Sequence, residues 1–318
     1  MIRPILLVVT PFSQEALVPL QEYFDIVQWQ SLPAPEAFCA QQGEGVQVLI
    51  TNGMVGVPVP VPAPCRDALA NLALVACNGV GYDAIDLGWA DARGIRVTNT
   101  PDVLSADVAD FALALALAAF RRVPAADRYV RENKWVRQGA FALTRRFWGS
   151  KVGIVGLGRI GHLIARRATA FDTQIGYTGR RQQDGVAYAY FPTVLALAGW
   201  ADLLIVATPG GADTHHLVSR AELEALGPEG VLVNIARGSV VNQSALIKCL
   251  ETGQLGAAAL DVFEQEPQVP EAIANSASTI LSPHIASATV QTRQAMAALV
   301  VDNVLQHING KCLISPVN

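Results

Sequence analysis

The stretch that decides the fold is KVGIVGLGRIG, residues 151–161. It begins as an apolar run typical of a strand, and its glycines then follow the spacing G-x-G-x-x-G before a helix-like segment. A strand before such glycines and a helix after them are the context in which this spacing indicates dinucleotide binding. The glycines allow a tight turn, so that a pyrophosphate can bind N–H groups at the helix N-terminus. The predicted cofactor contacts are Gly156, Leu157, Gly158, Arg159, Ile160 and Gly161.

Short apolar runs alternate with segments of helical length along the whole chain. This alternation predicts an α/β protein with parallel sheets, and a length of 318 residues favours about two domains. We therefore expect two Rossmann-like domains, each with a doubly wound parallel sheet. The runs expected as strands are 5–10, 25–29, 46–51, 72–77 and 94–99 in the first sheet, and 151–156, 174–179, 202–208, 231–236, 258–263 and 279–283 in the second.

The last segment of the chain, from about residue 288, has the pattern of a helix that could return to the first domain. We therefore expect one domain to combine residues 1–98 with 288–318, and the dinucleotide-binding domain to span 99–287. Between the two series of strands lie an apolar helix, 105–120, and an arm rich in arginine and aromatic residues that ends near residue 150.

The composition limits the classes of function. The formal net charge is −4 and no long basic run occurs, which argues against a nucleic-acid or membrane partner. The five cysteines are scattered and form no CxxC pair, which favours free thiols in a reducing compartment over disulfides or a metal site. The longest apolar helix is too short to span a bilayer. We expect a cytoplasmic enzyme without a metal.

The position that selects the cofactor lies at the end of the strand 174–179. An acidic residue there normally accepts hydrogen bonds from the ribose hydroxyls of NAD, but this chain has Gly179, followed by Arg180 and Arg181. A missing carboxylate removes repulsion of a 2′-phosphate, and guanidinium groups suit phosphate. The sequence thus predicts a preference for NADP(H); the alternative is a solvated arginine pair in an enzyme that still uses NAD(H).

One of the five histidines stands at the place where chemistry is expected. His284 follows the last predicted strand, and Arg237 and Glu266 follow neighbouring strands, at the edge where open α/β sheets bind ligands. Imidazole is the usual proton donor near neutral pH. Of the others, His162 and His307 are expected at the surface or in packing, whereas His215 and His216 could line the crevice.

Six blocks of sequence together resemble the family of D-isomer-specific 2-hydroxyacid dehydrogenases. They are CNGVGYDAIDL, RGIRVTNTPDVLSADVADF, VGIVGLGRIG, VNIARGSVV, ALDVFEQEP and SPHIASAT, and they occur in the family's order over almost the whole chain. The segments YTGRR and GVGYDAIDL and the ending NGKCLISPV are most similar to reductases of hydroxypyruvate, glyoxylate and hydroxyphenylpyruvate that use NADPH.

The resemblance implies a role for each of several residues. Arg237 would hold the substrate carboxylate and C2 oxygen, His284 would exchange the proton, and Glu266 would orient the imidazole and favour its charged form; Glu264 is the nearby competitor. Asp261 would hold the nicotinamide carboxamide, unless it is a buried carboxylate that caps local backbone. Ile235 would contact the cofactor through its backbone.

The first domain would complete the site by contributing substrate contacts in the cleft between the domains. The backbone of Val80 and Gly81 would bind the carboxylate, and Met54 and Val55 would touch the substrate's side group, although residues 51–56 suit a simple strand-to-helix turn equally well. The implied reaction is NADPH-dependent reduction of a small 2-oxo acid, such as glyoxylate or hydroxypyruvate, to the D-2-hydroxy acid.

The family also implies a homodimer whose interface is the helix 105–120 and the arm, unless these segments pack within one chain. In some relatives an aromatic residue of the arm reaches the partner's active site, and Trp135 is the candidate here. Two alternative functions use the same scaffold. One is a dinucleotide-sensing regulatory or corepressor protein, and the other is an enzyme similar to phosphoglycerate dehydrogenase, for which no extra basic substrate loop is evident.

Overall fold

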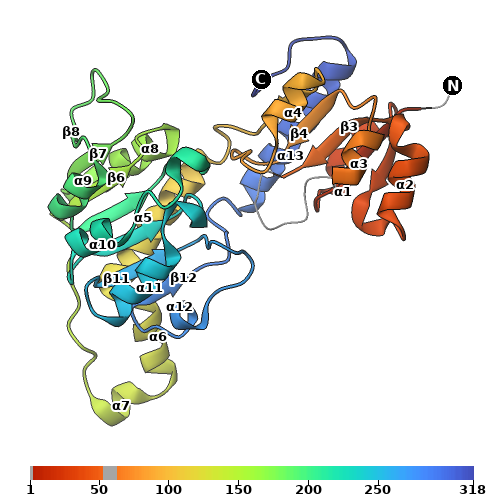
Figure 1. Cartoon of the computed structure of the whole chain (residues 1–318). Helices are drawn as coiled ribbons and strands as arrows, with labels where there is room; N and C mark the ends of the chain where they lie inside the picture. Colours follow the sequence, from red (N-terminus) through yellow and green to blue (C-terminus); the bar gives the residue numbers. More distant parts are fainter. Residues whose placement is uncertain (1–2, 53–62) are drawn as a thin grey trace. The chain divides into compact units, whose positions relative to one another are not determined.

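The computed structural model describes residues 3–52 and 63–318, and the chain divides into two compact units (Figure 1). Unit 1 comprises Met1–Leu104 and Thr289–Asn318, and unit 2 comprises Ser105–Ala288. The first segment of unit 1 thus continues beyond residue 98, where the sequence analysis places its end. Each unit has its own parallel sheet and its own core.

The described part of unit 1 contains a five-stranded sheet with the order β2-β1-β3-β4-β5. All of its neighbouring strands are parallel, as the unbroken apolar runs predict. The strands are β1 (Ile5–Val8), β2 (Asp25–Gln28), β3 (Val46–Thr51), β4 (Leu74–Cys77) and β5 (Arg96–Thr98).

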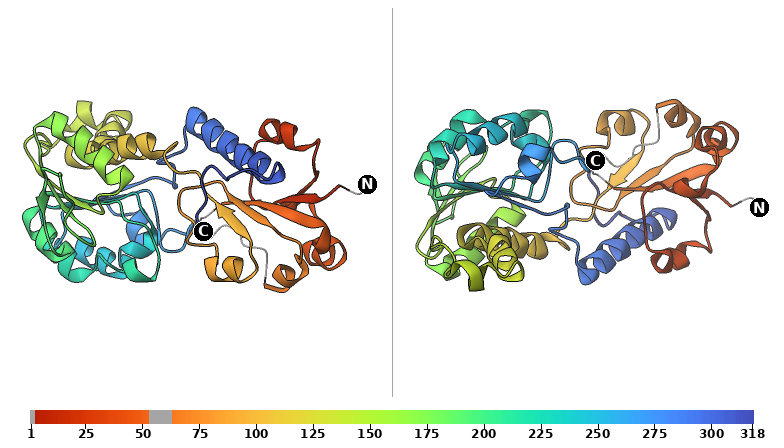
Figure 2. Two further views of the ribbon diagram at one scale, coloured as in Figure 1. Left: turned by 90° about the horizontal axis from the view of Figure 1, so that it is seen from above. Right: turned by 90° about the horizontal axis from the view of Figure 1, so that it is seen from below.

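Alternate residues of β1 enter the two cores on opposite faces of this sheet. Leu6 and Val8 pack in one core with Leu17 of α1 (Gln14–Leu17) and with α13 (Val290–Ile308), whereas Leu7 packs in the other. The second core includes residues of α2 (Pro35–Gln42), α3 (Ala63–Ala68) and α4 (Leu87–Ala92). Helices therefore cover both faces (Figure 2), and the closing helix α13 belongs to unit 1.

Unit 2 contains a seven-stranded parallel sheet with the order β12-β11-β10-β9-β6-β7-β8. The expectation of six strands was wrong by one, because β8 is a two-residue edge strand paired with β7 and is too short to form an apolar run. The strands are β6 (Lys151–Val155), β7 (Gln174–Thr178), β8 (Ala189–Tyr190), β9 (Leu203–Val206), β10 (Val231–Asn234), β11 (Ala257–Leu260) and β12 (Thr279–Leu281).

Helices cover both faces of this second sheet as well (Figure 2). The apolar helix α5 (Ser105–Arg121) contacts α8 (Arg159–Ala168) and strands β10 to β12. The other core contains buried residues of α9 (Val194–Trp200), α10 (Arg220–Leu226), α11 (Gln243–Glu251) and α12 (Glu271–Ala274). The arm consists of α6 (Val123–Arg131), α7 (Lys134–Gln138) and the segment up to residue 150, and it extends away from the sheet of unit 2 (Figure 1).

The topology gathers the predicted site residues of unit 2 at one edge of its sheet. Gly156 follows β6, Gly179 follows β7, Ile235 follows β10 and Asp261 follows β11. Because the strands are parallel, their carboxyl ends meet along the same edge, which is where such sheets bind ligands.

Two further findings concern membrane-spanning helices and the cysteines. None of the described helices has both the length and the apolar character needed to cross a membrane. All five cysteines are free thiols, and four of them are buried, while Cys312 is exposed.

We predict opposite effects on stability from the same substitution at two glycines of unit 2. A Cβ atom on Gly176 would lie 2.7 Å from the Trp200 ring and 2.8 Å from the Phe191 ring, so Gly176→Ala should lower the free energy of unfolding by about 1–3 kcal/mol. Gly199 lies on α9 with open space around it, so Gly199→Ala should raise that free energy by about 0.5–1 kcal/mol. Urea denaturation followed by circular dichroism measures both; equal effects would contradict the tight packing at Gly176.

Candidate active site

Each glycine of the turn after β6 meets a separate steric requirement. Gly156 has a φ of +95°, a conformation that side chains disfavour. A Cβ on Gly161 would lie 2.2 Å from the carbonyl oxygen of Gly156, whereas Gly158 has open space around its Cα. The first glycine thus permits the turn, the third permits close packing of the helix, and the second leaves the approach to the backbone clear, as dinucleotide binding requires.

The helix α8 begins directly at this turn, with Gly158 as its N-cap residue. Glycine offers no side chain to satisfy the first N–H groups of the helix, and Arg159 and Ile160 lie in its first turn. The N–H groups at a helix N-terminus and the positive end of the helix dipole favour an anion. These residues fit the pyrophosphate of a dinucleotide, which is the contact that the sequence predicts for them.

The loop after β7 is exposed but is tied to the glycine turn. Gly179 has open space around its Cα, and both Arg180 and Arg181 are exposed. Gln183, which the sequence analysis did not single out, donates a hydrogen bond from Nε2 to the Leu157 carbonyl at 2.8 Å. That bond fixes the arginine-bearing loop beside the predicted pyrophosphate site.

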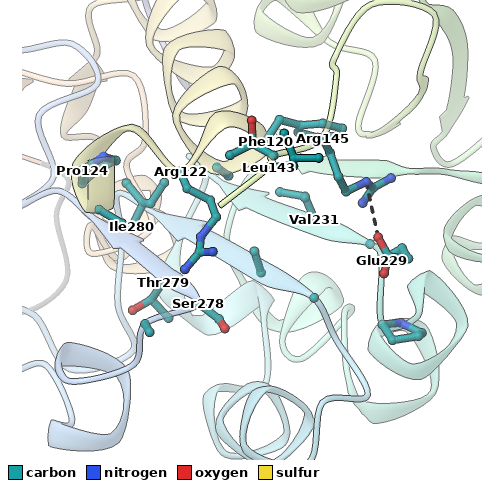
Figure 3. Close-up of a pocket in the computed structure, with 18 of the residues that line it drawn as sticks. Phe120, Arg122, Pro124, Leu143, Arg145, Glu229, Val231, Ser278, Thr279 and Ile280 are labelled. Carbon is teal, nitrogen blue, oxygen red and sulfur yellow. Dashed lines mark ion pairs between the residues drawn. The ribbon is translucent and has the colours of Figure 1, made fainter. Parts of the chain in front are cut away.

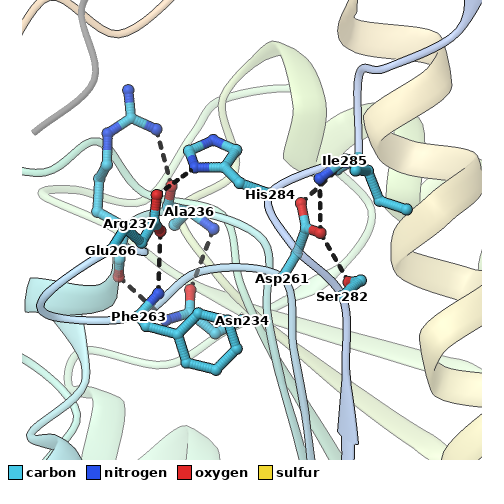
Figure 4. Close-up of polar contacts among 10 residues, drawn as sticks. Asn234, Ala236, Arg237, Asp261, Phe263, Glu266, Ser282, His284 and Ile285 are labelled. Atoms are coloured by element: carbon cyan, nitrogen blue, oxygen red, sulfur yellow. Dashed lines mark hydrogen bonds and ion pairs between the residues drawn. The ribbon is translucent and has the colours of Figure 1, made fainter. Parts of the chain in front are cut away.

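His284 and Glu266 form a close pair beyond the ends of β12 and β11 (Figure 4). The Nδ1 atom of His284 lies 2.8 Å from Oε2 of Glu266, and the two side chains are 22% and 17% exposed. The other carboxylate oxygen of Glu266 accepts a hydrogen bond from the Phe263 N–H at 3.0 Å. The pair is shielded enough for a strong interaction, and because Nδ1 faces Glu266, the remaining nitrogen, Nε2, is the one that can serve a substrate.

The buried carboxylate of Asp261 holds the loop that carries His284. Its oxygens accept hydrogen bonds from the Ser282 hydroxyl at 2.7 Å and from the N–H groups of Ile285 and Ala286 at 2.8 Å. Its backbone carbonyl accepts a fourth from the His284 N–H. Burial raises the pKa of Asp261, while the hydrogen bonds oppose that rise. This is the capping arrangement that the sequence analysis gave as the alternative; the contact with a carboxamide remains a prediction.

Arg237 lies three residues beyond the end of β10, on the same side of the sheet edge as Glu266 and His284 (Figure 4). Asn234, also missed from the sequence, shapes its backbone: Nδ2 donates to the Arg237 carbonyl and Oδ1 accepts from the Ala236 N–H, each at 3.0 Å. A Cβ on Gly238 would lie 1.9 Å from the Phe263 carbonyl carbon. The glycine therefore lets the segment with Arg237 pack against the segment that leads to Glu266.

A second histidine–glutamate pair includes Glu264, which lies two residues before Glu266 in the sequence. Nε2 of His216 is 2.9 Å from Oε1 of Glu264, and the same oxygen accepts a hydrogen bond from the Gln243 N–H at 3.0 Å. The ring of His215 stacks on that of His216. The structure thus gives Glu264 a partner of its own, and it pairs Glu266 with His284.

In unit 1, Val80 and Gly81 lie in the loop that follows β4. Met54 and Val55 lie outside the residues that the structure describes. Ile235 is buried after β10, where its backbone is the part that could contact a ligand. Trp135 lies on α7 of the arm and is 63% exposed.

Comparison with known proteins matches this geometry to a family. Residues 113–286 match the family described as "D-isomer specific 2-hydroxyacid dehydrogenase, NAD binding domain". The chain belongs to this family. It is therefore an oxidoreductase with an NAD(P)-binding domain, and the resemblance expected from the sequence is confirmed.

Similar proteins match over nearly the whole chain. The glyoxylate/hydroxypyruvate reductase A of Arabidopsis thaliana is 46% identical over 98% of both chains, and the hydroxyphenylpyruvate reductase of Plectranthus scutellarioides is 43% identical over the same shares. The crystal structure of an NADPH-dependent glyoxylate/hydroxypyruvate reductase from Sinorhizobium meliloti, in complex with NADP and malonate, is 42% identical. It has a TM-score of 0.91 and covers 99% of this chain and 97% of its own.

We predict that the two neighbouring glutamates contribute unequally to turnover. Glu266→Gln removes the negative charge beside His284 and should lower kcat by roughly tenfold or more, because an amide cannot stabilise the imidazolium. Glu264→Gln alters the contacts with His216 and with the Gln243 N–H, leaves the His284–Glu266 pair in place, and should change kcat by less than about threefold. Steady-state kinetics of both variants at equal pH tests the assignment, and a larger loss in Glu264→Gln would reverse it.

Proposed function

We propose that this enzyme reduces a small 2-oxo acid, such as glyoxylate or hydroxypyruvate, to the D-2-hydroxy acid with NADPH. The observation that carries the proposal is the His284–Glu266 pair, which lies beyond the same edge of the sheet as the glycine turn of Gly156, Gly158 and Gly161. The names of the similar reductases agree with it.

The side chains have separate roles in the proposed reaction. When bound, the nicotinamide supplies a hydride to C2 of the substrate. His284 donates the proton of Nε2 to the C2 oxygen as that oxygen gains charge, and Glu266 stabilises the imidazole through Nδ1. Arg237, which is always charged, binds the carboxylate through two parallel hydrogen bonds and orients the keto carbon. In unit 1, the backbone of Val80 and Gly81 would offer N–H donors to a carboxylate, whereas the predicted contacts of Met54 and Val55 with the side group lie outside the described residues.

The preference for NADPH over NADH rests on the loop after β7. Gly179 presents no carboxylate, and Arg180 and Arg181 are exposed beside the end of the strand. A 2′-phosphate would be bound at this place. The similar reductase from Sinorhizobium meliloti is named NADPH-dependent and was crystallised with NADP. An enzyme that uses both cofactors with a preference for NADP(H) fits these residues best.

The catalytic function is favoured over a dinucleotide-sensing regulator because Arg237, Glu266 and His284 are all present and Glu266 contacts His284. A function similar to phosphoglycerate dehydrogenase is not favoured by the names of the similar proteins. The four buried thiols support a cytoplasmic location as part of the proposal.

We predict the cofactor and substrate preference from this loop. The wild-type enzyme should oxidise NADPH faster than NADH in the presence of glyoxylate or hydroxypyruvate, followed as absorbance at 340 nm over a panel of 2-oxo acids.

Gly179→Asp should reverse the ratio of kcat/KM for the two cofactors, because the carboxylate repels a 2′-phosphate and accepts hydrogen bonds from the ribose. Replacing both Arg180 and Arg181 by Ala should raise KM for NADPH by roughly tenfold and leave KM for NADH nearly unchanged.

The matched control for the arginine change is Arg166→Ala, which removes an equally exposed charge from α8 at a distance from the loop. It should affect neither cofactor. A wild-type ratio in favour of NADH would refute the cofactor preference, and absence of turnover with every 2-oxo acid would refute the enzymatic proposal.

We further propose a homodimer formed through α5 and the arm. Half of the large apolar side chains that the structure shows exposed belong to residues 123–148 of the arm: Val123, Val130, Trp135, Val136, Leu143 and Trp148. Such a concentration of exposed apolar side chains is typical of an interaction surface. Trp135 is the residue proposed to reach the partner's active site.

A hollow beside the arm is consistent with this surface (Figure 3). It has a volume of about 380 Å³ and lies at the edge where β10, β11 and β12 begin, opposite to the edge with His284. Leu143, which is 100% exposed, and Arg122 line it, and Arg145 pairs with Glu229 at 3.5 Å. The hollow therefore offers apolar and charged groups to a second copy.

We predict that Leu143→Asp converts the dimer to a monomer, because it removes an exposed apolar side chain from the proposed interface and puts there a carboxylate that would lose its hydration on association. Analytical ultracentrifugation of wild type and variant measures the change. Leu195→Asp, at an exposed leucine of α9, is the control and should leave the dimer intact. A wild-type enzyme that sediments as a monomer would refute the proposed interface.

A further inference from the structure

The loop after β4 has three consecutive carbonyl groups that are all engaged. The Gly79 carbonyl accepts a hydrogen bond from the Thr100 N–H at 2.9 Å. The Val80 carbonyl accepts one from Nδ2 of Asn99 at 2.8 Å, and the Gly81 carbonyl lies 3.6 Å from the Cys77 thiol. The loop is therefore fastened through its oxygens to β4 and to the segment that follows β5.

This pattern determines where the N–H groups of the loop point. In a planar trans peptide, the N–H of one residue points away from the carbonyl of the residue before it. The N–H groups of Val80, Gly81 and Tyr82 therefore point away from Thr100, Asn99 and Cys77. Within the described part of the chain, these three N–H groups have no hydrogen-bond acceptor. Successive unpaired N–H groups are donors that a bound anion can satisfy.

The side chain of Asn99 ties this loop to the segment after β5, and the C-terminal tail holds the backbone of Asn99. The Ser315 hydroxyl donates to the Asn99 carbonyl at 2.6 Å, and the Asn99 N–H donates to the Ser315 carbonyl at 3.2 Å.

Ser315 is itself held from α13. Its hydroxyl accepts a hydrogen bond from Nδ2 of Asn303 at 2.9 Å, and Oδ1 of Asn303 accepts from the N–H groups of Ile314 and Ser315. Asn303 is fully buried and Ser315 is nearly so. A buried polar network with its partners satisfied fixes one arrangement, so the position of Asn99 is set from α13 through the tail.

We propose that Asn99, held by Ser315, is a positioning residue that turns the 79–82 loop so that the N–H groups of Val80, Gly81 and Tyr82 bind the substrate carboxylate. The inference rests on the proposed function for the identity of the anion, a 2-oxo acid. It assigns a role to the C-terminal ending NGKCLISPV, which the proposed reaction does not otherwise use, and it adds Tyr82 as a third backbone donor.

The test is the selective loss of affinity for the acid when Asn99 is truncated. Asn99→Ala should raise KM for the 2-oxo acid by about tenfold, with kcat changed by less than about threefold, because the lost contact binds substrate and transition state alike. KM for NADPH should stay within about twofold of the wild-type value. Ser315→Ala should give the same selective effect, at about threefold. Oxalate, an unreactive carboxylate, should lose affinity in parallel when titrated calorimetrically against each protein.

The control is Asn309→Ala, which removes an exposed amide that bonds to the Leu305 carbonyl near the end of α13 and should alter none of these constants. Equal increases of both KM values in Asn99→Ala, or unchanged acid KM and oxalate affinity, would overturn the proposal. If Asn99→Ala fails to fold, the comparison of Ser315→Ala with wild type decides in the same way. A wild-type protein that binds oxalate more tightly than Asn99→Ala but reduces no 2-oxo acid would refute the proposed function and leave the carboxylate site standing.

Discussion

The buried carboxylate of Asp261 is the group on which the geometry of the candidate active site depends. A charge without exposure to water is unfavourable unless hydrogen bonds compensate it, and Asp261 obtains three, all from residues 282–286. They hold the loop although His284 has a φ of +54°, a conformation that costs a non-glycine residue about 1–3 kcal/mol. Asp261 and Glu266 both follow the same strand, β11. The positions of His284 and Glu266 are therefore both set relative to that strand.

Hydrogen-bond donors also compensate negative charge wherever this chain is expected to bind an anion. The chain is slightly acidic overall, yet its proposed ligands, a dinucleotide and a 2-oxo acid, are both negatively charged. Local donors resolve this conflict: N–H groups at the start of α8, N–H groups of the 79–82 loop and the guanidinium of Arg237. Every residue except proline supplies a backbone N–H donor, but the direction of that donor depends on what holds the carbonyl of the preceding residue. For the 79–82 loop, Asn99 and Thr100 do so.

Much of the fold and the His284–Glu266 pair could be predicted from sequence because the signals are local. Apolar runs mark the buried strands, and the glycines mark the turn after β6. Glu266 was singled out over Glu264 by family resemblance. The strand β8 could not be predicted, because two residues at a sheet edge carry no pattern. Asn99, Gln183 and Asn234 were missed for a different reason. Each donates a hydrogen bond from its side chain to a backbone carbonyl oxygen. Every residue has such a carbonyl, so the type of the accepting residue does not indicate the bond.

The choice between cofactors shows how a missing side chain can determine specificity. Discrimination is a difference between two affinities, and it can arise from removing a repulsive group as well as from adding an attractive one. Because solvent and salt screen exposed arginines, the pair Arg180 and Arg181 contributes no more than about a tenfold change in KM for NADPH. Gly179 contributes by lacking a carboxylate, and Gln183 contributes by fastening the loop to Leu157, which limits how far Arg180 and Arg181 can move from the ribose. The expected result is a graded preference for NADP(H), because nothing in the described loop excludes the ribose hydroxyls of NAD(H).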